Sequence, residues 1–142
     1  MTRSSNVIES FRLVVGNKNV ITNKWSKEPF ITGWRYGKGE ALAVIKPGTL
    51  LEMWYVLKVC VKNDVSVIMQ AANTGLTGGS TPFGNDYDRP IVIINTLRIK
   101  SIHIIKNGDQ IIALPGSSLY DLENKLKPLG KEPHSVIGST SI

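Results

Sequence analysis

Two short apolar runs separated by a helical pattern constrain the fold of this 142-residue chain more than any other feature. Residues 41–45 form an apolar run closed by Pro47-Gly48, and residues 65–69 form a second run of strand-forming residues. Between them, Thr49 and Glu52 have the spacing of a helix capping box. Apolar residues then recur at helical spacing at Leu50, Met53, Trp54, Leu57, Cys60 and Val61. The pattern predicts one β-α-β unit whose helix ends at Asn63-Asp64.

A third strand and a β-hairpin are predicted further along the chain. Pro90 precedes an apolar run at residues 91–94. Two further β-rich runs, residues 101–105 and 110–114, flank Asn107-Gly108. Asn-Gly between two such runs is a strong hairpin signal.

A helix is predicted after the hairpin. It begins near Ser117 or Ser118, and Gly130 is the expected C-terminal stop. Its apolar face is formed by Leu119, Leu122, Leu126 and Leu129.

One parallel unit followed by a hairpin and a helix predicts an α+β fold in two small layers. We expect an N-terminal helix and a mixed loop over residues 1–38, and the main domain over residues 39–142. A soft internal boundary is expected near Thr96.

Composition restricts the class of protein. With 42% hydrophobic residues the chain is long enough for one real core, and two full domains are not expected. The formal charge of +6 suits an anionic ligand, an anionic lipid surface or nucleic acid, without choosing among them. The single cysteine allows no internal disulfide, and neither a transmembrane run nor a secretory signal is predicted. We therefore expect a soluble cytoplasmic protein.

The stretch from Gln70 to Pro82 is the part of the sequence that suggests chemistry. It contains glycines and hydroxyl side chains and no charged residue. Backbone amides in such a loop can form a concave site for phosphate oxygens. The loop lacks the lysine of a Walker loop, and its glycine spacing does not fit the dinucleotide fingerprint. From composition alone, a plain glycine-rich connection is an equally good interpretation.

Several runs, in the same order along the chain, resemble the FAD-binding domain of the quinone-dependent D-lactate dehydrogenases. These are respiratory flavoproteins of the vanillyl-alcohol-oxidase type, with a PCMH-type FAD-binding domain. The resemblance is carried by Gly39-Glu40-Ala41-Leu42-Ala43, by residues 71–82, by Asn85-Asp86-Tyr87-Asp88-Arg89 and by residues 126–139.

The resemblance implies that FAD lies between two α+β subdomains with its pyrophosphate on the glycine-rich loop. The residues implied to contact the cofactor are Ala71, Ala72, Asn73, Thr74, Gly75, Gly79 and Ser80, with Gly138 beginning a second contact segment. No His or Cys occurs from Ala71 to Pro82, so the FAD is expected to be non-covalent. The implied activity is oxidation of D-lactate to pyruvate with quinone as acceptor. The family is peripheral on the cytoplasmic side of the inner membrane.

The sequence stops at Ile142, whereas the family continues into further cofactor contacts and a substrate-binding cap. No catalytic residue is assigned, and we expect the chain alone to bind FAD weakly or not at all. Two alternatives remain open: a truncated, catalytically silent remnant without flavin, and the FAD domain of another 2-hydroxy-acid oxidoreductase. Self-association through an uncovered apolar face is also expected.

The remaining candidate residues favour structural roles. His103 on a hairpin strand and Cys60 on an apolar helix face are interpreted as structural, and His134 as a hydrogen-bonding residue. Two histidines and one cysteine give no metal-ligand spacing, so no metal site is predicted. The basic residues are scattered and the tryptophans form no stacking platform, so nucleic-acid binding is not predicted.

Overall fold

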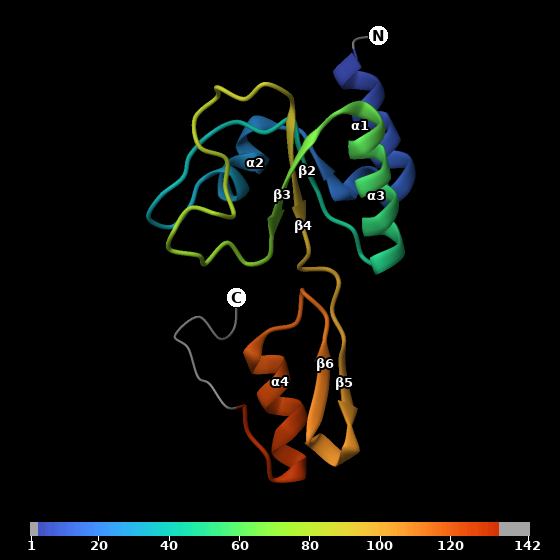
Figure 1. Cartoon of the computed structure of the whole chain (residues 1–142), viewed down its shortest axis with the longest axis vertical. Helices are drawn as coiled ribbons and strands as arrows, with labels where there is room; N and C mark the ends of the chain where they lie inside the picture. Colours follow the sequence, from blue (N-terminus) through green and yellow to red (C-terminus); the bar gives the residue numbers. More distant parts are fainter. Residues whose placement is uncertain (1–2, 134–142) are drawn as a thin grey trace.

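In the computed structural model, which describes residues 3–133, the chain forms a four-stranded sheet and a separate two-stranded sheet. Figure 1 shows the larger sheet and its helices at one end of the molecule, and the smaller sheet and its helix at the other. The predicted α+β class is confirmed.

The four-stranded sheet has the order β1-β2-β4-β3. Its strands are β1 (Val20–Ile21), β2 (Ala43–Ile45), β3 (Ser66–Gln70) and β4 (Ile91–Asn95). Both β2 and β3 run parallel to β4, and β1 pairs antiparallel with β2. The predicted β-α-β unit is therefore present, but its two strands are not neighbours, because the wholly apolar third strand lies between them.

β4 is buried on both faces. Val92 and Ile94 pack in one core cluster with α1 (Arg3–Val15) and α3 (Leu50–Asn63). Ile93 packs in a second cluster, against α2 (Lys24–Ile31). Alternate side chains of a strand point to opposite faces, so a continuous apolar run is what a strand covered on both sides requires.

The apolar face of α3 is rotated from the one predicted. Val56 and Cys60 are buried, whereas Trp54 is 50% exposed and Val61 83% exposed. The predicted apolar face was right at Cys60 and wrong at Trp54 and Val61. The prediction mixed residues from both sides of a helix that is apolar nearly all round. Burial raises the pKa of the Cys60 thiol to about 11, which agrees with the predicted structural role.

The N-terminal cap of α3 is also shifted by one residue from the predicted capping box. Thr49 accepts a hydrogen bond from the Glu52 amide, as predicted. The Glu52 carboxylate, however, accepts from the Gly48 amide at 2.7 Å rather than from that of Thr49. The helix ends at Asn63-Asp64, as predicted, and Asp64 at its C-terminal cap is in the left-handed region.

The segment before β2 was predicted as an N-terminal helix followed by a loop, but it contains two further elements, β1 and α2. Asn23 caps α2 by accepting from the amides of Trp25 and Ser26. Pro29 lies inside this helix and removes one backbone donor, which conceals the helical pattern in the sequence.

The second half of the chain follows the prediction closely. β5 (Ile102–Ile105) and β6 (Gln110–Ala113) form the hairpin, and Asn107 at its turn has a φ of 54°. α4 (Leu119–Leu126) begins with a capping box between Ser118 and Asp121. Gly116 of this half packs closely against the residues that follow β4. A Cβ at Gly116 would lie 2.4 Å from the Thr96 carbonyl oxygen.

No helix within the described residues is long and apolar enough to cross a membrane.

We expect Phe11→Ala to lower the free energy of unfolding by about 3–5 kcal/mol, because the Phe11 side chain is fully buried between α1 and the sheet. Leu13 is on the same helix but is 81% exposed, so Leu13→Ala should change the free energy by less than about 0.5 kcal/mol. Urea denaturation of both variants measures the difference. Equal effects would contradict the assigned packing face of α1.

Candidate functional site

The glycine-rich loop begins where β3 ends. Because β2, β3 and β4 are parallel, their carboxyl ends form a single edge of the sheet. Figure 1 shows that this edge faces the half of the molecule that contains β5 and β6. The carboxyl edge of a parallel sheet is where open α/β folds bind their ligands.

Two buried side-chain amides hold the loop at this edge. Gln70 donates from Nε2 to the carbonyl oxygens of Phe30 and Ser80, both at 2.8 Å. Asn95, at the end of β4, donates to the Ala71 carbonyl at 2.8 Å and to Gln70 Oε1 at 3.3 Å. The two ends of the loop are therefore fixed to the same pair of residues.

Asn73 and Ser80 use their side chains within the protein. Asn73 has a φ of 58°, and its Nδ2 donates to the carbonyl oxygens of Thr32 at 2.9 Å and Pro29 at 3.2 Å. Its Oδ1 accepts from the Ser80 hydroxyl at 2.8 Å. These contacts brace the loop against the end of α2, so what the loop offers to a ligand is chiefly its backbone.

The backbone amides of the loop are available as donors. Within residues 3–133, no acceptor is found for any amide from Ala72 to Ser80, whereas the Thr81 amide bonds to the Gly78 carbonyl. A Cβ built on Gly79 would have no atom within 4 Å, so the loop is open at this point. Unpaired amides without neighbouring carboxylates suit the oxygens of a diphosphate.

The structure places seven of the predicted site residues on this one loop: Ala71, Ala72, Asn73, Thr74, Gly75, Gly79 and Ser80. The eighth, Gly138, lies outside the described residues, as does His134. The sequence interpretation missed the anchoring role of Gln70 and Asn95. The available signal was a polar amide at the last position of each of two apolar strands.

The other candidate groups have partners of their own. Arg89 forms ion pairs with Asp64 and Asp88, both at 2.8 Å, and the pKa of Asp88 is lowered by this contact. His103 is exposed, with Nε2 at 2.8 Å from the Ser101 hydroxyl. Among residues 3–133, no group of His, Cys, Asp and Glu is arranged to hold a metal ion.

We expect Asn73→Asp to reduce the free energy of unfolding by about 1–3 kcal/mol, the usual effect of losing two intramolecular hydrogen bonds. A carboxylate would face two carbonyl oxygens at this position. Asp tolerates a positive φ much as Asn does, so the backbone conformation adds no further cost. Thermal and urea unfolding measure the effect. An unchanged stability would show that the Asn73 contacts do not hold the loop.

Comparisons with known proteins identify the family of this chain. Residues 41–140 match the model of the FAD-binding domain family. The chain is 61% identical over 129 residues to the quinone-dependent D-lactate dehydrogenase of Haemophilus influenzae, covering 91% of this chain and 23% of that protein. The corresponding enzyme of Corynebacterium glutamicum is 50% identical over 141 residues, covering 99% of this chain and 25% of that protein.

The fold is shared more widely. Alkyldihydroxyacetonephosphate synthase superposes with a TM-score of 0.77 at 14% identity, over 89% of this chain and 25% of that one. The chain spans about a quarter of the length of the curated relatives that it matches. The family match covers most of the chain, and the predicted resemblance is confirmed: the protein belongs to the FAD-binding domain family.

Proposed function

We propose that this chain is the pyrophosphate-binding part of the FAD domain of a quinone-dependent D-lactate dehydrogenase. The observation that carries the proposal is the loop of unpaired amides from Ala72 to Ser80, fixed at the carboxyl edge of the sheet by Gln70 and Asn95. The names of the two relatives reported above support D-lactate as the substrate and a quinone as the electron acceptor.

In this proposal the loop amides donate to the phosphate oxygens of FAD. Amides carry partial positive charge at fixed positions, so they stabilise an anion without a charged side chain that must lose its water. The side chains of Asn73 and Ser80 position the loop rather than contact the phosphates directly. The loop contains neither His nor Cys from Ala71 to Pro82, which favours non-covalent binding.

Bound FAD supplies the two-electron acceptor for oxidation of a 2-hydroxy acid. We assign no residue of this chain to the lactate carboxylate or to the hydroxyl proton. The proposed role of the chain is to bind and orient the cofactor.

We expect Gly79→Asp to weaken FAD binding by roughly tenfold or more, about 1.4 kcal/mol, because its carboxylate would repel the pyrophosphate. The open space around Gly79 lets the chain accept the side chain without a clash. Gly79→Asn has nearly the same shape without the charge, so it is the matched control and should bind FAD more tightly than Gly79→Asp. Titration of flavin fluorescence measures both affinities. Equal affinities would show that the phosphates bind elsewhere.

We also expect no reduction of a quinone analogue when FAD and D-lactate are added to the 142-residue chain. The reason is that cofactor binding alone does not place an α-hydrogen against the flavin. Dye reduction followed by absorbance is the measurement, with a curated relative as the positive control. Sustained turnover would contradict the proposal that this chain binds and orients the cofactor without supplying the catalytic groups.

A further inference from the structure

A short hairpin between α2 and β2 lies against the glycine-rich loop. Thr32 and Lys38 form an antiparallel bridge, and the Gly33 amide donates to the Gly37 carbonyl at 2.7 Å. A Cβ on Gly33 would lie 1.9 Å from the Tyr36 carbonyl oxygen, and Gly37 has a φ of 86°. The hairpin therefore requires glycine at both positions, and its conformation is tightly defined.

Contacts on several sides join this hairpin to the loop. The Thr32 carbonyl accepts from Asn73 Nδ2 at 2.9 Å. A Cβ on Gly37 would lie 2.0 Å from the Thr81 hydroxyl oxygen, and one on Gly78 would lie 3.5 Å from the Tyr36 Cβ. The hairpin and the glycine-rich loop are thus one packed unit.

An ion pair fixes the base of the hairpin to α2. Lys38 Nζ lies 2.8 Å from Glu28 Oε1, and this contact lowers the pKa of Glu28. Both groups are exposed, so the pair orients the hairpin more than it stabilises the fold.

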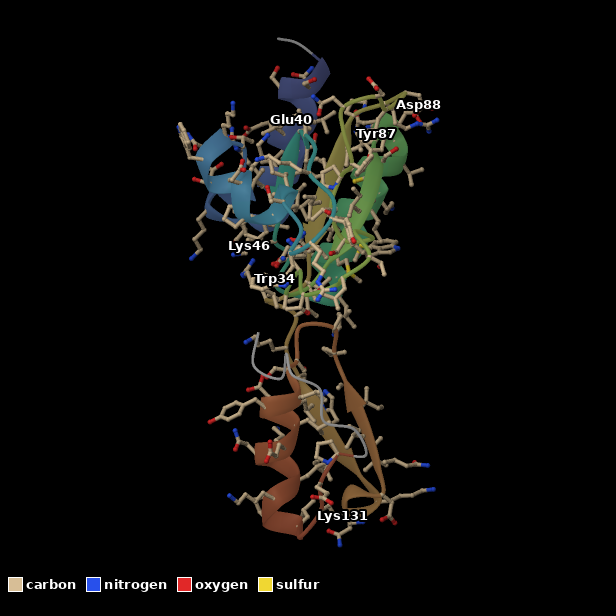
Figure 2. All side chains as sticks on the ribbon, turned by 90° about the vertical axis from the view of Figure 1, so that its left-hand side faces the viewer. Trp34, Glu40, Lys46, Tyr87, Asp88 and Lys131 are labelled. Carbon is tan, nitrogen blue, oxygen red and sulfur yellow. The ribbon has the colours of Figure 1, made fainter. Side chains whose placement is uncertain are left out.

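The tip of the hairpin is apolar and exposed. Trp34 is 79% exposed and Tyr36 is 65% exposed. Figure 2 shows Trp34 at the edge of the four-stranded half that faces β5 and β6, the same edge that carries the loop. Arg35, between the two aromatic residues, is also exposed and adds positive charge beside an uncharged loop.

We infer that this hairpin is a second wall of the cofactor site, in which the Trp34 indole packs on one of the two flat rings of FAD. The inference rests on the proposed function and adds a residue to it. FAD carries a ring system on each side of its pyrophosphate. A hairpin packed against the glycine-rich loop is therefore placed to contact one of these two ring systems. An exposed indole offers a flat apolar surface for this contact, and an adjacent cation suits an anionic cofactor.

The three tryptophans of the chain make the inference directly testable. Each indole N–H gives its own NMR signal, which is assigned from the spectra of Trp25→Phe, Trp34→Phe and Trp54→Phe. On titration with FAD, the signals of the loop amides and of the Trp34 indole should shift together, including when binding is weak. The signals of Trp25 and Trp54, which lie on α2 and α3, should stay in place.

Affinity gives a second measurement. Trp34→Ala should weaken FAD binding by roughly tenfold, the order expected for one ring stacked on an aromatic side chain. Trp25→Ala is the matched control, because Trp25 is 82% exposed and makes no ring contact in the described part of the chain. It should leave the affinity unchanged.

The outcomes separate the two proposals. If FAD shifts the NMR signals of the loop amides but not that of the Trp34 indole, and Trp34→Ala binds FAD as the wild type does, the proposed contact with Trp34 is wrong. The proposed pyrophosphate site then stands. If FAD shifts no loop amide, the proposed function fails and the wall with it. Parallel titrations with ADP and with riboflavin 5′-phosphate identify the ring, because each compound carries only one of the two.

Discussion

The glycine-rich loop of this protein depends on a pair of buried side-chain amides, Gln70 and Asn95, at the ends of two neighbouring parallel strands. A loop whose own amides are mostly unpaired gains little stability from backbone hydrogen bonds, so side-chain contacts must hold its shape. Gln70 does this by bonding to Ser80, ten residues further along the chain. Removing either amide would leave part-buried carbonyl groups without donors, so the two amides and the loop ends that they hold depend on one another.

Side chains and backbone have separate roles in this loop. Asn73 and Ser80 are typical phosphate-binding residue types, yet their polar atoms are directed toward α2 and toward each other. Their bonds keep the loop in place while its amides remain free. In the proposed function, binding through amides would make the site tolerant of changes in side chains that point away from it, and sensitive to any change that adds negative charge at an open glycine.

The sequence predicted elements with local signals and missed those defined by distant contacts. The Asn107-Gly108 turn, the Thr49 cap of α3 and the start of α4 near Ser118 were predicted because each depends on residues a few positions apart. α2 was missed because Pro29 lies inside it. The Gln70–Asn95 contact joins residues 25 positions apart, so the polar amide at the end of each strand indicates neither its partner nor the loop that it anchors. The loop itself was recognised from its composition and resemblance, whereas its anchors became visible only in three dimensions.

The strand order has a consequence for how the protein is made. β4 is the last strand of the four-stranded sheet to leave the ribosome, yet it is the common partner of β2 and β3. Until Asn95 emerges, β3 has no neighbour in this sheet and β2 has only β1. At about 5–20 residues per second, the 25 residues from Gln70 to Asn95 take roughly 1–5 s to synthesise. During that interval the nascent chain exposes apolar strand edges, and this is when a chaperone would protect it most.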